Sequence, residues 1–109
     1  MAFDETLAGR VRKKISARRD IVEKKMFGGL AFLLNGNMSV GIHGNELIVR
    51  VDPDETEALL KQKGVRIFDI TGRPMKGWLL VDGAAIRKDA SLTKWIEKGT
   101  SYASSLPKK

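Results

Sequence analysis

Residues 26–51 decide the fold, and they read MFGGLAFLLNGNMSVGIHGNELIVRV. Asn35 and Gly36 lie between two apolar runs, which is the strongest short-range signal for a two-residue β-turn. Gly44 and Asn45 give a second turn signal, beginning eight residues after Gly36. This spacing predicts a meander with strands over residues 29–34, 37–43 and 46–51.

Two-residue turns also determine which residues of the three strands lie opposite each other. The predicted pairs are Leu33 with Met38, Ala31 with Val40, Gly29 with Ile42, Ile42 with Leu47, and Val40 with Val49. Because side chains alternate between the faces of a sheet, this register makes one face entirely apolar, and we expect that face to be buried. Its large side chains are Met38, Val40, Ile42, Leu47, Val49 and Val51.

The opposite face of the meander mixes apolar and polar side chains. We expect its centre, formed by Leu30, Phe32, Gly41, Ile48 and Arg50, to bind a protein partner or a second copy of the chain. Gly41 would leave a shallow depression, and Arg50 would stack on Phe32 and present its guanidinium group to a carboxylate. The alternative is that a helix covers this face, which then forms a second core layer.

Capping signals predict helices on both sides of the meander. Asp4 precedes Leu7, Val11 and Ile15 at helical spacing, so a first helix is expected to run to about Arg18. A second helix is expected to begin at Asp52-Pro53 and end at Gly64, and a third to begin at Asp89 or Ser91.

Further strands are predicted over residues 23–27, 65–70 and 77–82. The expected fold class is therefore α+β. We predict a single antiparallel sheet of about five strands with a central three-strand meander, packed by N-terminal, middle and C-terminal helices.

The chain has 109 residues, and we expect one domain over residues 1–109. It contains no cysteine, which excludes disulfides and cysteine-ligated metal sites. The first residues, MAFDETL, carry acidic groups where a signal peptide needs basic ones, and no apolar run reaches the length of a membrane span. We therefore expect a cytoplasmic protein that does not contact membranes.

The formal net charge of +7 is concentrated at the two ends of the sequence. Residues 1–25 carry a net charge of +4, residues 26–86 of −1, and residues 87–109 of +4. The basic side of the first helix is either a solvated surface, as on many helices, or a nucleic-acid-binding patch. The residues of that patch would be Arg12, Lys13, Arg18 and Arg19.

Catalytic groups are scarce in this sequence. His43 is the only histidine, and its nearest expected acidic neighbour is Glu46 across a turn. The sequence has no nucleophile elbow, no carboxylate pair spaced for acid–base catalysis and no second histidine for a zinc site. We therefore predict no catalytic residue, no metal and no cofactor.

Several motifs in order resemble a known family. They are MFGG at residues 26–29, NG at 35–36, LIVRVD at 47–52, GWLLVD at 77–82 and WIEKG at 95–99. The pattern resembles the N-terminal domain of the TfoX/Sxy competence regulators over residues 5–106. This resemblance implies a bacterial protein with an α+β fold and gives no catalytic residue to carry over.

Longer members of that family carry a second, helical domain and are associated with inducing genes for DNA uptake, together with the cyclic-AMP receptor protein. The sequence has no such segment up to residue 109, so a stand-alone domain is expected.

We predict a non-enzymatic regulatory module that acts through protein–protein contacts in transcriptional regulation. Its partner would be a protein such as a transcription regulator, or a second copy of the chain. Nucleic-acid binding through the basic N-terminal helix and the C-terminal segment is the alternative.

Overall fold

The computed structural model describes residues 3–16, 20–26, 28–69 and 75–107, and it has the predicted α+β architecture. Within these residues one antiparallel sheet has six strands in the order β1-β2-β3-β4-β6-β5. The strands are β1 (Ile21–Met26), β2 (Gly29–Leu34), β3 (Asn37–His43), β4 (Glu46–Arg50), β5 (Val65–Phe68) and β6 (Met75–Val81). The α-helices are α1 (Glu5–Ile15), α2 (Thr56–Leu60) and α3 (Asp89–Ser104), and two short 3-10 helices are η1 (Pro53–Glu55) and η2 (Gly83–Ile86).

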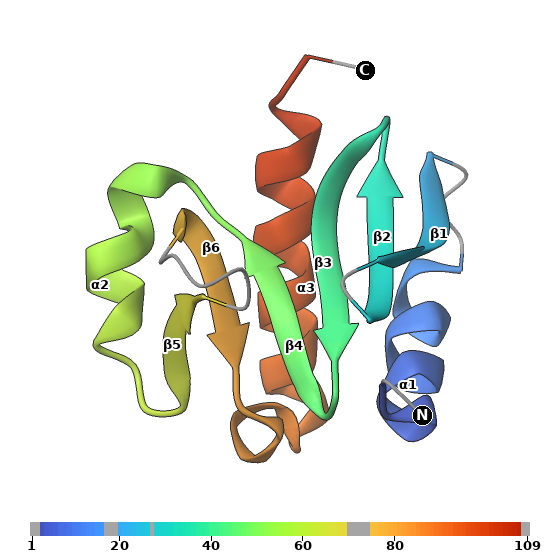
Figure 1. Cartoon of the computed structure of the whole chain (residues 1–109), viewed down its shortest axis with the longest axis horizontal. Helices are drawn as coiled ribbons and strands as arrows, with labels where there is room; N and C mark the ends of the chain where they lie inside the picture. Colours follow the sequence, from blue (N-terminus) through green and yellow to red (C-terminus); the bar gives the residue numbers. More distant parts are fainter. Residues whose placement is uncertain (1–2, 17–19, 27, 70–74, 108–109) are drawn as a thin grey trace.

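The main core lies between the helices and one face of the sheet. Figure 1 shows α3 behind the middle strands and no helix in front of them. Leu7 and Val11 of α1, Leu59 of α2, and Leu92 and Trp95 of α3 pack against this face. A second apolar cluster of Ala31, Met38, Ile48, Phe68 and Leu80 lies on the opposite face, on which no described helix packs. The sheet therefore buries apolar side chains on both of its faces.

The predicted turn at Asn35-Gly36 and the predicted caps Asp4 and Asp52 are present in the structure. Asn35 and Gly36 both have positive φ, 51° and 84°, as the tight hairpin turn between β2 and β3 requires. Asp4 begins α1, and its Oδ1 accepts hydrogen bonds from the backbone N–H groups of Thr6 and Leu7 at 2.8 and 3.1 Å. Asp52 similarly begins η1.

The predicted register is confirmed between β3 and β4, where Ile42 pairs with Leu47 and Val40 with Val49. Between β2 and β3 only the pair nearest the turn, Leu33 with Met38, is confirmed. Beyond it the prediction is wrong by one residue: Phe32 pairs with Val40, Ala31 with Gly41, and Leu30 with Ile42. The predicted core residues Val40, Ile42, Leu47, Val49 and Val51 lie in the main core, whereas Met38 belongs to the opposite cluster.

A β-bulge at Ser39 causes this shift. The pairing moves one residue along β2, from Phe32 to Leu33, but two residues along β3, from Val40 to Met38. The side chain of Ser39 is fully buried, and its hydroxyl group donates a 2.9 Å hydrogen bond to the carbonyl oxygen of Phe32. The extra residue turns Leu30 and Phe32 toward the helices, the face predicted for Ala31 and Leu33.

Several predicted boundaries are also corrected. α1 ends at Ile15, not near Arg18, which lies outside the described residues. The sheet has six strands where about five were predicted, since all the segments predicted as strands pair in it, with β1 at residues 21–26 and β5 at 65–68. The N-cap of α3 is Lys88, and no side chain caps the helix; Asp89, one of the two predicted caps, is the first helical residue and its carboxylate pairs with Lys14.

Replacing Gly99 with alanine should destabilise the protein. A Cβ atom at Gly99 of α3 would lie 2.5 Å from the carbonyl oxygen of Ser39 and 2.7 Å from Cγ1 of Val40. Because the oxygen belongs to the backbone of the bulge, the helix must move away from the sheet. We expect Gly99→Ala to lower the free energy of unfolding by about 1–3 kcal/mol, measured by denaturant titration.

Gly9→Ala is the matched control, because Gly9 is exposed on α1 and a Cβ there would meet no atom within 4 Å. This variant should be about 0.5–1 kcal/mol more stable than the unmodified chain, since alanine favours a helix. Equal effects of the two substitutions would contradict the close contact between α3 and the bulge.

Candidate functional site

Arg50 ends β4 at the point where β4, β6 and α3 meet. Its Cζ atom lies 4.9 Å from the ring centroid of Trp78 and 5.8 Å from that of Tyr102. Trp78 is the cross-strand partner of Arg50 on β6, and Tyr102 comes from the C-terminal part of α3. All three side chains are half-buried. Two cation–π contacts from different elements therefore hold one guanidinium group at the surface.

The backbone around Arg50 is fixed by hydrogen bonds to the segment after β4. The N–H of Val51 donates to the carbonyl of Gly77 at 2.8 Å, and the N–H of Gly77 donates to Oγ1 of Thr56 at 2.9 Å. Gly77 has a φ of 91°, which favours glycine, and a Cβ there would lie 3.2 Å from Pro53. These contacts join β4, β6 and α2, so Arg50 stands on a rigid support.

The indole ring of Trp78 is positioned by the second apolar cluster. It packs against Phe68 with the two ring centroids 6.2 Å apart and the planes tilted by 52°. This geometry is favourable for an aromatic pair. Phe68 is itself buried on β5, so the indole ring cannot easily leave Arg50.

The guanidinium group of Arg50 keeps its hydrogen-bond donors for a ligand. Arg10 donates to backbone carbonyls, and Arg12 and Arg66 donate to carboxylates, whereas Arg50 has no ion-pair or hydrogen-bond partner within the described parts of the chain. A stacked guanidinium group presents its N–H edge in one plane, which matches the two oxygens of a carboxylate. The arrangement is suited to binding an acidic side chain or a chain terminus.

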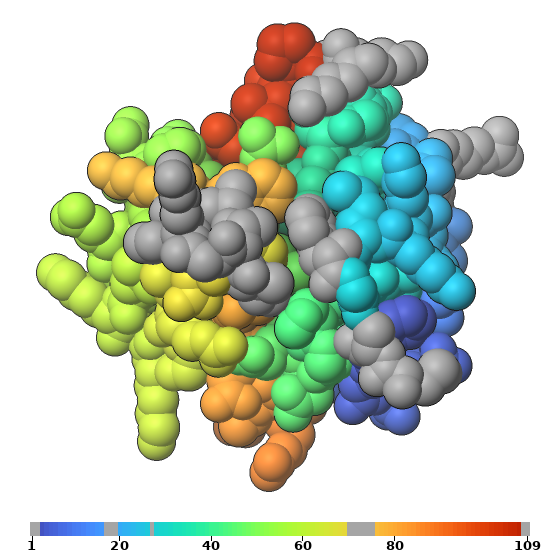
Figure 2. All heavy atoms as spheres, viewed as in Figure 1, coloured from blue at the N-terminus to red at the C-terminus, as the bar shows by residue number. Residues whose placement is uncertain are grey.

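A hollow of about 510 Å3 lies next to Tyr102, between α3 and the segment that follows β4. Figure 2 shows the end of α3 (red) at the top of the molecule, next to green atoms of the region around the end of β4. An ion pair of 3.0 Å between Lys98 and Glu55 crosses the hollow. Its lining residues are Val51, Asp52, Glu55, Lys94, Glu97, Lys98, Ser101, Tyr102 and Ser105.

The five residues predicted to bind a protein do not share an exposed face. Leu30 and Phe32 point into the main core with 2% and 1% exposure, and Ile48 is 1% exposed on the opposite face. Gly41 is buried as well, so Arg50 alone of the five reaches the surface. The alternative prediction is confirmed only in part: Ile48 belongs to a second buried cluster, but none of the described helices covers it. The β-bulge is the reason that Phe32 lies on the other face.

Two details of that predicted surface are also wrong. Gly41 leaves no depression, because a Cβ atom there would lie 2.6 Å from Cε of Met38 and 2.8 Å from the carbonyl oxygen of Leu30. Arg50 stacks on Trp78 and Tyr102, not on Phe32. Trp78 and Tyr102 could be recognised as aromatic residues near predicted element ends, but their meeting depends on strand order and on the path of α3.

The structure describes two of the four predicted nucleic-acid-binding residues, Arg12 and Lys13. Arg12 pairs with Glu23 of β1 through two hydrogen bonds of 2.6 and 2.7 Å, and this contact lowers the pKa of Glu23 below its ordinary value. Lys13 is exposed. Arg18 and Arg19 lie outside the described residues. Lys13 instead shares a hollow with Arg10 and Lys14, two further cations of the same helix.

His43 lies opposite Glu46, as predicted from the turn. The carboxylate of Glu46 is bound by both terminal nitrogens of Arg66 on β5, one of them at 2.8 Å. The described segments contain no group of three or more histidine, cysteine, aspartate or glutamate residues placed to hold a metal ion. No helix in the described part of the chain has the length and apolar character needed to cross a membrane.

These features define a small α+β domain whose helices pack on one face of a single antiparallel sheet. The family model of the TfoX N-terminal domain matches residues 13–103, and the chain belongs to that family. Comparison with curated proteins gave no significant match. Comparison with solved structures gave none either.

Truncating Phe32 should test its position in the main core. Phe32→Ala removes a fully buried ring and leaves a cavity, so we expect a loss of about 3–5 kcal/mol in the free energy of unfolding. Val22→Ala on β1 is the control: Val22 is 62% exposed, and its truncation should cost about 0.5 kcal/mol or less. If Phe32→Ala were as mild as the control in denaturant titration, the ring would not be a core residue.

Proposed function

We propose that this domain is a non-enzymatic regulatory module that works by binding a protein partner in transcriptional regulation. The contact is made by Arg50 together with Trp78 and Tyr102, and it receives a carboxylate from an acidic segment of the partner. Membership of the TfoX N-terminal domain family supports a regulatory module. The binding role is supported by the site itself.

The proposal depends on one observation: the guanidinium group of Arg50 is stacked on two rings but has no acceptor for its N–H groups within the described residues. The residue is half-buried, stacked on two rings and without an ion-pair or hydrogen-bond partner within the described residues, whereas Glu55 and Asp52 nearby in the sequence already bind Lys98 and the backbone of η1. Holding a charged group in this way has a cost in desolvation that water only partly offsets. A bidentate carboxylate from a partner would complete its hydrogen bonds.

The surroundings favour a polypeptide partner. The two aromatic rings are the residue types that most often supply binding energy at protein interfaces, and arginine is the third. The adjacent hollow of about 510 Å3 is lined by groups of both charges and by hydroxyl groups, which suits a polar peptide segment. The net charge of +7 also favours association with an acidic partner.

Loss of the Arg50 guanidinium should weaken partner binding. The test is affinity capture from an extract of the native cells, with and without nuclease treatment, using the unmodified chain and Arg50→Gln. We expect a captured protein to be retained at least about tenfold less well by Arg50→Gln, a difference of about 1.4 kcal/mol. Arg50→Lys should also weaken capture, because an ammonium group cannot make the planar bidentate contact.

Arg66→Gln is the matched control, since Arg66 is an exposed arginine of β5 already paired with Glu46, and it should capture the partner normally. Thermal unfolding of each variant confirms that it is folded. Equal capture by Arg50→Gln and the unmodified chain would contradict the site. Two other outcomes would overturn the proposal: capture that disappears with nuclease, and a captured protein that proves to be a second copy of the chain.

A further inference from the structure

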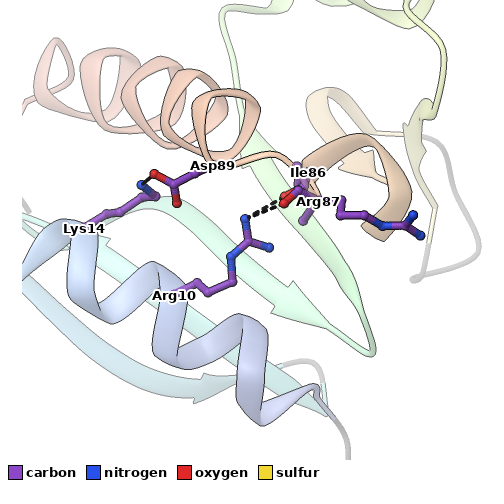
Figure 3. A network of polar contacts seen from close by, with 5 residues as sticks. All are labelled: Arg10, Lys14, Ile86, Arg87 and Asp89. Atoms are coloured by element: carbon purple, nitrogen blue, oxygen red, sulfur yellow. Dashed lines mark hydrogen bonds and ion pairs between the residues drawn. The ribbon is translucent and has the colours of Figure 1, made fainter.

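Three cations of α1 surround one carboxylate at the beginning of α3. Arg10, Lys13, Lys14 and Asp89 line a hollow of about 410 Å3, and every one of these lining side chains is charged. Figure 3 shows Lys14 reaching Asp89 while Arg10 reaches the end of η2. We name Arg10, Lys13 and Lys14 the basic cluster. It lies far from Arg50, which is near the other end of α3.

Two members of the basic cluster are held in place. Nη2 of Arg10 donates to the carbonyl oxygens of Ile86 and Arg87 at 2.9 and 3.1 Å. These acceptors are neutral, so the guanidinium group keeps its full charge while its position is fixed. The side chain of Lys14 is 19% exposed, and its Nζ lies 2.7 Å from Oδ2 of Asp89. Lys13 is exposed and completes the group.

Asp89 marks the point on which the basic cluster converges. Its pKa lies below the ordinary value, first because Lys14 donates a hydrogen bond to it, and further because of the charges of Lys14, Arg10 and Lys13. Its side chain is nevertheless 76% exposed, so little packing holds it there. The Asp89 carboxylate is therefore an internal anion held by three cations. If the Asp89 side chain rotates away, an external anion of higher charge can take its place.

We propose that the basic cluster binds the phosphate backbone of duplex nucleic acid, with Asp89 displaced from Lys14 by a phosphate group. This contact is separate from the partner site at Arg50. A phosphate group carries a negative charge and acceptor oxygen atoms, so it can take the place of the Asp89 carboxylate beside the basic cluster. The described lining consists of charged side chains alone, which suits a phosphate backbone better than stacked single-stranded bases or an apolar peptide.

The test is binding of the intact chain to a fluorescently labelled DNA duplex of about 20 base pairs, measured by anisotropy at several salt concentrations. Lys13→Gln with Lys14→Gln should weaken binding at least about tenfold at low salt. The slope of log K against log salt should become shallower by about 0.9 for each phosphate that the variant no longer binds, or about 1.8 for two phosphates. Asp89→Asn should strengthen binding several-fold, because the internal competitor has lost its charge.

Lys61→Gln with Lys63→Gln is the matched control. Both lysines are exposed between α2 and β5, on the opposite side of the molecule from α1, and the net charge changes by the same amount.

Equal losses in the two double variants would overturn the proposal, because they would show a general charge effect. No binding by the intact chain at low salt, or weaker binding by Asp89→Asn, would do so too. If poly-glutamate binds as tightly as the duplex with the same dependence on Lys13 and Lys14, the surface recognises acidic protein instead.

Discussion

The contact between the bulge at Ser39 and α3 is the constraint on which the rest of the structure depends. The hydroxyl group of Ser39 donates to the carbonyl of Phe32, and this bond stabilises the extra residue of β3 inside the sheet. The carbonyl group of Ser39 then lies against Gly99, where only glycine allows the helix to come so close. One irregular residue thereby sets which side chains of β2 face the helices and how closely the helices pack.

This arrangement leaves little apolar surface for binding. The main core takes Leu30 and Phe32, and the opposite cluster takes Ile48 and Phe68, so both faces of the sheet are used for stability. Val22, at 62%, is the only large hydrophobic residue among the described ones that is mostly exposed. Arg50 is a charged residue at the end of a strand, and its side chain stays partly accessible. This distribution is the reason that the proposed partner contact uses an oriented charge and not an apolar patch.

Local signals in the sequence are sufficient to predict much of the fold. The turn at Asn35 and the cap at Asp4 use backbone chemistry that a few neighbouring residues determine, and both predictions are confirmed. The bulge is not predictable in this way, because Ser39 occupies a buried position that only the opposite strand and α3 explain. The candidate site is predictable only in part: the sequence indicates Arg50 as a carboxylate-binding group, but its contact with Trp78 requires β4 to pair with β6, and no local pattern predicts strand order.

The number of basic residues in the sequence does not show which of them are free to bind a ligand, because that depends on their contacts in the fold. The two ends of the sequence are equally basic, yet several of their cations already have internal partners. Arg12 is paired with Glu23, and Lys98 with Glu55, so neither adds much free charge to the surface. The two proposed binding groups, Arg50 and the basic cluster, lie near opposite ends of α3, a helix of 16 residues that extends for about 24 Å. Because the same helix is fixed to the sheet at Gly99, a phosphate backbone at one end and an acidic segment at the other can be held at a constant separation.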